Sequence, residues 1–335
     1  MVPAAGALGS GAMSAMRYVP LGDSDLEVSV VGVGCNAFGA RIDAERTRAV
    51  VDAAVDAGVT LFDTADVYGD GASEELLGRA LAGRRDEVVV ATKFGMHTGA
   101  EELVGGHGTR EYVRRAVEGS LRRLGTDHID LYQLHRPDPL TPVEETLEAL
   151  TELVAEGKVR HIGSSNLAAW QVVDADWVSR TRGLQRFVSA QNEYSLYNRV
   201  AEDELVPAAE AVGVGILPYF PLAYGLLTGK YRRGEHAPEG SRLADPRQAR
   251  RLETADWDRI EALEAFAVER DLPLLTVAIG GLAAQPGVTS VICGASRPEQ
   301  IPANVESGLW EPSLDDLAAL DAIRPEARYS YTTFA

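Results

Sequence analysis

The sequence of 335 residues contains little cysteine and no long apolar run. Its two cysteines, Cys35 and Cys293, are too far apart for a CxxC pair or for the ligand spacing of a zinc site. Both lie in apolar runs typical of strands, which predicts buried free thiols and fits the reducing cytoplasm. Because no apolar run is long enough to span a bilayer, we expect no association with membranes.

Positive charge is scarce as well. The chain has 32 Lys and Arg against 50 Asp and Glu, a formal net charge of -18. An acidic surface of this size disfavours nucleic acid and anionic membranes as partners. With 45% hydrophobic and 24% charged residues, the composition is otherwise that of a globular protein with a large core.

The first sixteen residues, MVPAAGALGSGAMSAM, lack the basic segment and long apolar run of a signal peptide. Their Ala, Gly and Ser content predicts a disordered leader over residues 1–16, with Met13 and Met16 as alternative starts of translation. We expect one domain over residues 17–335, since nothing in this range marks a domain boundary.

Strand-like and helix-like runs alternate from Arg17 onwards. RYVPLG and LEVSVVGVG, separated by turn residues, predict a β-hairpin whose second arm continues into an apolar strand. The centres of eight predicted strands are Val31, Leu61, Val90, Leu131, Ile162, Ser189, Ile216 and Val291. Most lie about 30 residues apart, the length of one strand–helix–strand step. Apolar strands alternating with helices predict a parallel sheet covered by helices, and eight of them predict a closed (β/α)8 TIM barrel of the α/β class.

The main competing fold is a doubly wound sheet, which would carry GxGxxG after its first strand. The sequence there, GVGCNAFG, lacks that spacing. After the seventh strand, residues 220–256 are rich in Gly, Pro and charge and predict a long functional loop. We expect residues 96–108, residues 170–182 and the tail from Arg324 to form further loops that determine the substrate.

Four chemically active side chains follow the ends of three neighbouring predicted strands. Asp63 ends the second strand, in LFDTADVYG, and Tyr68 follows five residues later. Lys93 ends the third strand, and His135 ends the fourth. Each has an ordinary alternative: a structural hydrogen bond for Asp63 and Tyr68, a position at the rim for Lys93, and a strand cap for His135. Active sites of such barrels lie at the carboxyl ends of the strands, where these four residues would meet.

This combination suits the reduction of a carbonyl group. A phenol has a pKa near ~10 and donates a proton poorly at neutral pH. An ammonium group lowers that pKa, so we expect Lys93 to make Tyr68 more acidic. Asp63 would keep the ammonium charged, and His135 would donate to the carbonyl oxygen. Metal-dependent hydrolysis would need clustered histidines, and the six present, at positions 97, 107, 128, 135, 161 and 236, predict no metal site.

Further motifs extend this pattern along nearly the whole chain. They are FDTADVYG, VVVATK, DLYQLHRPDP, GKVRHIGSSN, QNEYS, PYFPLAYGLLTGKY and VICGASRPEQIPANV. With this ordered series the chain resembles the aldo-keto reductase family. The resemblance implies a (β/α)8 barrel that binds NADP(H) without a Rossmann domain. It also implies a catalytic set of Asp63, Tyr68, Lys93 and His135, with Tyr68 as the general acid.

The same resemblance implies which residues hold the cofactor. Ser165, Asn166 and Gln191 would bind the nicotinamide carboxamide, and Tyr219 would stack on the nicotinamide ring. The pyrophosphate would lie against Pro221, Leu222, Gly229, Lys230 and Arg242. The adenosine and its 2′-phosphate would lie against Gly294, Ser296, Arg297, Gln300 and Asn304. Phe220 stands where many relatives have Ser, and Ala303 where many have Glu, which removes two expected contacts and leaves the preference for NADP over NAD less defined.

The expected function is NADPH-dependent reduction of an aldehyde or ketone, with a small-molecule carbonyl or alcohol as substrate. Three alternatives stay open: an NAD(P)-dependent sugar or pyridoxal dehydrogenase working in the oxidative direction, a cofactor-sensing regulatory subunit like the potassium-channel β subunits of the family, and a barrel isomerase or lyase without redox chemistry. The sequence defines neither the physiological substrate nor the oligomeric state.

Overall fold

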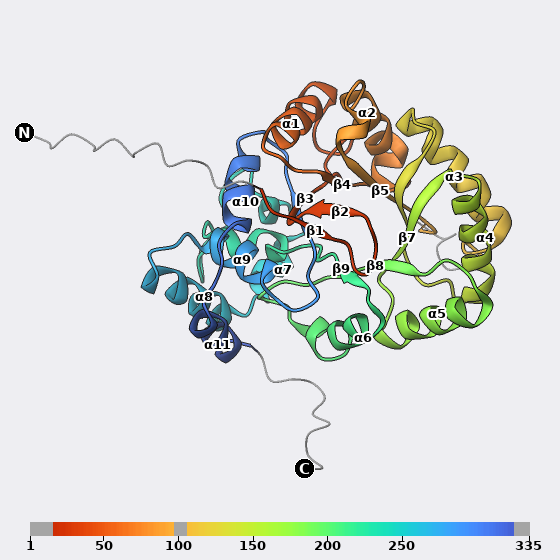
Figure 1. The fold of residues 1–335 in the computed structure, drawn as a ribbon. Coiled ribbons are helices and arrows are strands. Elements are labelled where there is room, and N and C mark those ends of the chain that lie inside the picture. The colour runs from red at the N-terminus through yellow and green to blue at the C-terminus, as the bar shows by residue number, and fades with distance from the viewer. Residues whose placement is uncertain (1–15, 97–105, 325–335) are drawn as a thin grey trace, which may run out of the picture.

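The computed structural model describes residues 16–96 and 106–324 and forms a barrel surrounded by helices (Figure 1). The strands are β1 (Tyr18–Pro20), β2 (Glu27–Ser29), β3 (Val31–Gly34), β4 (Leu61–Asp63), β5 (Val89–Phe94), β6 (Ile129–Leu134), β7 (Val159–Ser165), β8 (Phe187–Gln191), β9 (Gly215–Ile216) and β10 (Val291–Gly294). The helices are α1 (Ala44–Asp56), α2 (Ala72–Ala80), α3 (Arg110–Leu124), α4 (Val143–Ala155), α5 (Ala169–Arg182), α6 (Leu205–Val212), α7 (Ala249–Glu253), α8 (Trp257–Glu269), α9 (Leu274–Ala283), α10 (Gln300–Gly308) and α11 (Leu314–Ala322).

Eight parallel strands form the barrel wall. They are hydrogen-bonded in the order β10-β3-β4-β5-β6-β7-β8-β9. The two end strands are joined where the Thr289 amide donates to the Ile216 carbonyl (2.9 Å) and the Ile292 amide donates to the Pro218 carbonyl (3.0 Å). Every predicted strand centre lies within one of these eight strands. The predicted (β/α)8 barrel is therefore confirmed.

The β1–β2 hairpin covers the amino-terminal mouth of the barrel. The two strands pair antiparallel, with Tyr18 opposite Ser29, and Figure 1 shows them lying across the barrel strands. Leu21 and Val28 of the hairpin are fully buried in one apolar cluster with Leu131 from the barrel interior. Because this mouth is filled with packed side chains, the opposite mouth, at the carboxyl ends of the strands, is the one left for chemistry.

One predicted loop is a helix. Residues 170–182, expected as a substrate-determining loop, belong to α5, so that prediction is wrong. The helix has an unusual surface, because Trp170 and Trp177 are 67% and 64% exposed while its buried face includes Ala175 and Ser179. In α5 the large apolar residues lie outside and small residues lie inside. The sequence therefore does not show the alternation of apolar and polar residues that marks an amphipathic helix.

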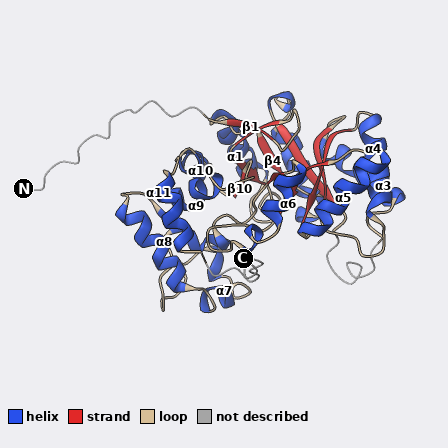
Figure 2. Cartoon of the chain, turned by 60° about the horizontal axis from the view of Figure 1, so that its bottom comes forward, coloured by secondary structure: helices blue, strands red, loops and turns tan. Residues whose placement is uncertain are grey.

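A second apolar cluster lies beside the barrel. It joins the segment after β9 to α8, α9 and α11, with Leu227, Tyr231 and Ile260 among its buried members. Figure 2 shows α7, α8 and α11 grouped to one side of the strands. Residues 220–256, predicted to be one long loop, consist of turns, two short 3₁₀ segments and the five-residue helix α7. Packing against the second cluster fixes this segment next to the carboxyl ends of the strands.

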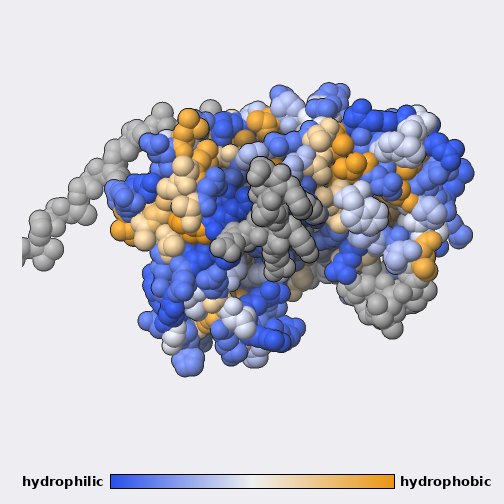
Figure 3. Space-filling view, turned by 90° about the horizontal axis from the view of Figure 1, so that it is seen from below, coloured by the Kyte–Doolittle hydropathy of each residue, from blue (hydrophilic) through white to orange (hydrophobic). Residues whose placement is uncertain are grey.

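The surface is mostly hydrophilic on the face seen in Figure 3, with separate apolar patches. Exposed large apolar side chains include Leu140, Val268 and Leu314. Among residues 16–96 and 106–324, no helix has both the length and the apolarity that a bilayer crossing requires. The predicted leader, residues 1–15 of which lie outside the described ranges, cannot be compared with the structure.

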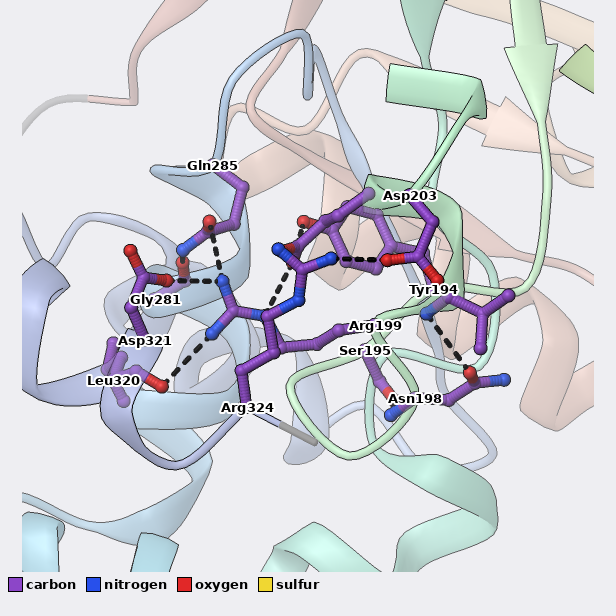
Figure 4. A network of polar contacts seen from close by, with 12 residues as sticks. Tyr194, Ser195, Asn198, Arg199, Asp203, Gly281, Gln285, Leu320, Asp321 and Arg324 are labelled. Atoms are coloured by element: carbon purple, nitrogen blue, oxygen red, sulfur yellow. Dashed lines mark hydrogen bonds and ion pairs between the residues drawn. The ribbon is translucent and has the colours of Figure 1, made fainter. Parts of the chain in front are cut away.

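A buried arginine ties the carboxyl-terminal helix to the loop after β8 (Figure 4). Arg199, only 2% exposed, binds the Glu202 carboxylate at 2.5 Å and the Asp321 carboxylate at 2.6 Å. It also donates to the Leu320 carbonyl at 3.0 Å and to the Gln285 side chain at 3.3 Å. One guanidinium thus joins three segments that are far apart in the chain.

We expect Arg199→Met to lower the free energy of unfolding by about 3 kcal/mol, because it removes the buried guanidinium that pairs with the largely buried Glu202 carboxylate and leaves Glu202 with only Arg324 and the Tyr194 hydroxyl. Chemical denaturation followed by circular dichroism measures this change. Arg48→Met is the matched control, since Arg48 pairs with Asp52 on the exposed surface of α1 and such pairs contribute less than about 1 kcal/mol. An equal effect of the two substitutions would contradict a structural role for the Arg199 network.

Candidate active site

An ion pair lies at the carboxyl-terminal mouth of the barrel. The Lys93 ammonium on β5 is 2.6 Å from the Asp63 carboxylate at the end of β4, and both side chains are buried. The ammonium also donates to the Thr64 carbonyl at 2.8 Å and lies 5.1 Å from the centre of the Tyr68 ring. The Tyr68 ring meets the His135 ring edge to face, with centres 5.8 Å apart. The structure therefore brings the four predicted catalytic side chains together.

Two glutamines hold the other oxygen of Asp63. Gln133 on β6 and Gln191 on β8 donate to Asp63 Oδ1 at 3.2 and 2.8 Å. Together with Lys93 on Oδ2, they satisfy the carboxylate from three strands. Gln133 was missed by the sequence analysis, although a signal was present: it is two residues before His135 in an apolar strand, so both side chains share one face.

The turn that carries Tyr68 is held at both of its ends. Before the turn, the Thr64 hydroxyl is 2.8 Å from the Ser73 hydroxyl, and Ser73 donates to the Cys35 carbonyl at 2.9 Å. Within the turn, Asp70 and Gly71 have positive φ angles of 54° and 91°. A side chain on Gly71 would meet the Arg123 side chain at 2.7 Å, so only glycine fits there.

A buried carboxylate lies behind this turn. Glu74, fully buried at the start of α2, accepts from the Thr92 hydroxyl and from the Arg123 guanidinium, both at 2.6 Å. Thr92 precedes Lys93 on β5, so this contact fixes α2 against the strand that carries the ammonium. Together with the Thr64–Ser73 bond, it fixes the position of the Tyr68 turn relative to Lys93.

The expected acidic phenol is not present in this structure. Burial raises the pKa of Tyr68 above its ordinary value of 10.0, and this outweighs the lowering by Lys93, which includes a hydrogen bond between the two side chains. The prediction of a lowered pKa is therefore wrong for the described structure. Burial opposes the charge on Lys93, but Asp63 and Tyr68 favour it, and its pKa is raised. The ammonium thus stays charged and the phenol stays protonated at neutral pH.

His135 is neutral at this site. Burial, followed by the positive charges of Lys93 and Arg136, lowers the pKa of its ring to about 2. Its Nδ1 atom is buried and has no hydrogen-bond partner within the described residues. An uncharged ring has one N–H to donate and one nitrogen to accept.

The predicted nicotinamide-binding residues surround the same mouth. Asn166, with a φ of 61°, donates to the His135 carbonyl at 3.0 Å and accepts from the Tyr219 hydroxyl at 2.7 Å. Ser165 also accepts from Asn166 at 3.0 Å. Gln191 lies within the set but is engaged with Asp63 in this structure. The contacts of Asn166 join the end of β7 to the end of β6 and to the segment after β9.

The residues predicted to bind the pyrophosphate follow β9 in a compact turn. Pro221 and Leu222 precede a 3₁₀ segment over Ala223–Thr228, and Gly229 ends it with a φ of 73°. Lys230 is exposed and lies 5.2 Å from the centre of the Tyr231 ring. Arg242 begins the next 3₁₀ segment, and its guanidinium is 5.2 Å from the centre of the Phe220 ring. The structure therefore brings Arg242 back to the turn that contains Pro221.

The residues predicted to bind the adenosine follow β10. Gly294 is exposed, and no atom lies within 4 Å of the position that a side chain would take. The Gln300 side chain accepts from the amides of Ser296 (2.9 Å) and Arg297 (3.1 Å). Gln300 therefore caps both amides in this structure. Asn304 is buried within α10.

A cavity of about 370 Å³ lies beside the long segment after β9. Its walls include Tyr197, Arg199, Tyr224, Arg251 and Arg324. Tyr197 and Tyr224 thus face a cavity, whereas Phe38 and Tyr194 are fully buried in the core. Among residues 16–96 and 106–324, no group of three His, Cys, Asp or Glu side chains could hold a metal ion.

Comparison with known proteins adds an independent finding. The sequence model of the Aldo/keto reductase family matches residues 30–325. A protein of Oryza sativa subsp. japonica named "Probable voltage-gated potassium channel subunit beta" is 34% identical over 336 residues, covering 94% of this chain and 100% of the relative. "Aldo-keto reductase YhdN" of Bacillus subtilis (strain 168) is 34% identical over 317 residues, covering 92% and 93%. "Uncharacterized oxidoreductase YrpG" of the same strain is 36% identical over 299 residues, covering 85% and 89%.

Asp66, near Glu74 and Arg123, gives the site a testable pH dependence. Burial, followed by the charge of Glu74, raises the pKa of Asp66 to about 7, and its Oδ1 atom has no partner within the described residues. In the unfolded chain the pKa of Asp is near ~3.9. The proton bound to Asp66 therefore stabilises the folded state. This stabilisation is fully present below about pH 4 and is lost as the pH rises through 7.

We expect Asp66→Asn to raise the free energy of unfolding by about 2 kcal/mol at pH 8 and to leave it nearly unchanged at pH 4, because the amide has no proton to lose. Urea denaturation at the two pH values measures the difference. Asp174→Asn, on the exposed face of α5, controls for the change of side chain. A gain at pH 4 equal to that at pH 8 would show that Asp66 is ionised over the whole range.

Proposed function

Because the chain belongs to the aldo/keto reductase family, we propose that it reduces an aldehyde or ketone to the alcohol with NADPH as hydride donor. The single observation that best supports this reaction is the buried Lys93–Asp63 ion pair beside the Tyr68 ring. It keeps a positive charge next to the phenol that would give up a proton. The family itself supports an oxidoreductase, and the choice of NADPH and the role of Tyr68 are parts of the proposal.

In this reaction Tyr68 donates the proton to the carbonyl oxygen of the substrate. The raised pKa of Tyr68 keeps that proton in place before the reaction. As the proton leaves, the phenolate that forms is stabilised by the Lys93 ammonium, whose charge is in turn held by Asp63. This stabilisation is larger in a buried site than in water, because little solvent screens it.

His135 orients the substrate in this proposal. A neutral ring can donate one N–H to the carbonyl oxygen without competing with Tyr68 as an acid. The low pKa of His135 supports such a role, since a ring with a pKa of about 2 stays uncharged at every pH at which the protein would work. Its Nδ1 atom, which is buried and has no partner among residues 16–96 and 106–324, supports a further contact that forms only when a ligand is bound.

The fit of NADPH to this chain rests on two observations. Arg242 forms no ion pair with a carboxylate in the described part of the chain, although burial lowers its pKa and a counter-ion would be favourable. Gly294 leaves open space at the end of β10. Asn166, Gln191 and Tyr219 would hold the nicotinamide, with Arg242 on the phosphates. When bound, NADPH would supply the hydride.

Two neighbouring functions are distinguished by experiment. The similarity to proteins named as probable potassium-channel β subunits favours a regulatory subunit that binds NADPH with little turnover. Tight NADPH binding, absence of turnover with a panel of carbonyls, and purification with a larger partner would support that function over ours. Faster oxidation of sugars or pyridoxine-type alcohols than reduction of carbonyls would identify the reverse direction as the working one.

The decisive variant is Tyr68→Phe. We expect it to lower kcat for carbonyl reduction by at least about a hundredfold, since it removes the proton donor, and to leave the Kd for NADPH within about twofold. Steady-state kinetics on an aldehyde panel and titration of cofactor fluorescence measure the two effects. The matched control is Tyr18→Phe, at the opposite mouth of the barrel. Wild-type turnover by the Tyr68 variant would end the proposal.

The pH profile gives a second test. Because the folded protein holds the pKa of Tyr68 above 10.0, the acid form is present throughout the neutral range. We expect kcat for reduction to stay constant from about pH 6 to pH 9 and to fall only at higher pH. A profile that falls with a midpoint near 6.5 would instead report an ionising histidine and contradict a neutral His135.

A further inference from the structure

A buried glutamine inside the barrel contacts the catalytic ion pair. Gln133 on β6 is fully buried and donates to Asp63 Oδ1 at 3.2 Å. Its side-chain oxygen accepts from the Ser189 hydroxyl on β8, a long contact of 3.5 Å. Because Asp63 ends β4, the Gln133 side chain reaches past the intervening strand β5 to meet it. This side chain therefore links two sides of the barrel interior through one carboxylate.

The barrel interior leaves room for the Gln133 side chain. In the strand register Gln133 pairs with Gly163, and Gly163 pairs with Ser189, so these three residues lie at one level of the barrel. A side chain on Gly163 would come within 2.2 Å of the Ser189 hydroxyl and within 3.1 Å of Gln133 Cγ. Glycine at this position of β7 thus provides the space that Gln133 occupies.

The second amide on Asp63 lies nearer the mouth of the barrel. Gln191 donates to Asp63 Oδ1 at 2.8 Å and pairs in register with Ser165. This level is two residues beyond that of Gln133, which corresponds to roughly 7 Å along a strand. The Gln191 carbonyl also accepts from the Asn166 amide at 3.0 Å. Gln191 therefore lies beside the residues proposed to hold the nicotinamide, whereas Gln133 lies deeper in the barrel.

Asp63 and a bound dinucleotide would draw on the same amide of Gln191. In the proposed function this amide binds the nicotinamide carboxamide, but in the described structure it is engaged with Asp63. A buried carboxylate oxygen left without a donor is unfavourable, because it has lost its contacts with water and gained none in return. Gln191 can therefore turn toward a ligand more easily when another donor stays on Asp63 Oδ1, and Gln133 is such a donor.

We propose that Gln133 is a positioning residue that holds Asp63 in place while Gln191 turns from Asp63 to the dinucleotide. The inference rests on the proposed function and deepens it, because it links cofactor binding to the catalytic ion pair. Gln133 acts through Asp63, whose other oxygen stays on the Lys93 ammonium at 2.6 Å. Without Gln133, Asp63 would compete with the ligand for Gln191.

A double-mutant cycle tests this competition. Gln133→Met and Gln191→Met each keep the length of the side chain and remove its donor, and a further protein carries both substitutions. Fluorescence titration gives the Kd of each protein for NADPH. We expect Gln133→Met to raise the Kd by about tenfold where Gln191 is present, and by less than about twofold in the Gln191→Met background, where no exchange can occur.

Ser189→Ala is the matched control, because it removes only the long contact on the oxygen of Gln133. We expect it to change the Kd for NADPH by less than about twofold. An equal rise of the Kd in both backgrounds of the cycle would overturn the proposal, since it would show that Gln133→Met only loosens the barrel. An unchanged Kd in Gln133→Met would also overturn it. Gln191 would then serve Asp63 and the ligand at once, through its two N–H groups.

Unfolding of the ligand-free protein separates this inference from the proposed function. Because Gln133 and Gln191 share one oxygen of Asp63, the double variant should lose more unfolding free energy than the two single variants together. Urea denaturation measures these losses. Such an excess in a protein that does not bind NADPH would support the sharing of Asp63 and end the proposed function. Additive losses would overturn the inference even in a protein that binds NADPH.

Discussion

The structure depends on one buried charge. Lys93 lies at the centre of the barrel mouth, where an isolated ammonium would be strongly unfavourable. It is stable there because Asp63 and the Thr64 carbonyl accept its hydrogen bonds, and because Gln133 and Gln191 occupy the remaining oxygen of Asp63. Residues of four barrel strands, β4, β5, β6 and β8, therefore belong to the hydrogen-bond network around the Lys93 ammonium. Any ligand that enters this mouth meets a positive charge already fixed in position.

That constraint explains why the acidity of Tyr68 differs from the sequence prediction. The prediction treated the ammonium as the only influence on the phenol, whereas burial opposes phenolate formation more strongly in the described structure. The two effects belong to different stages of a reaction. In the proposed reaction, burial would keep the proton on Tyr68 while the site is at rest, and Lys93 would lower the energy of the phenolate once the proton is transferred. A proton donor requires both.

Much of the barrel could be predicted from the sequence, because strand spacing and apolar runs depend on local residue types. All eight predicted strand centres lie in barrel strands. Helix α5 escaped prediction because tertiary contacts bury its small residues and leave Trp170 and Trp177 outside. At the site, strand ends revealed the charged residues, but the supporting contacts of Glu74 could not be foreseen. They join residues distant in sequence, and no local pattern marks them.

The two segments that form this mouth of the barrel are held in place by different kinds of contact. Tyr68 is fixed through Ser73 and Glu74 to α2 and the neighbouring strands, so its position depends on packing formed during folding. The segment that carries Tyr224 is held differently, by a second apolar cluster and by ion pairs to α8 such as Arg233–Glu261. In the proposed function, this division would place a rigid proton donor opposite the segment that holds the dinucleotide. The chemical step would need fixed distances, whereas the dinucleotide would have to be released after each turnover.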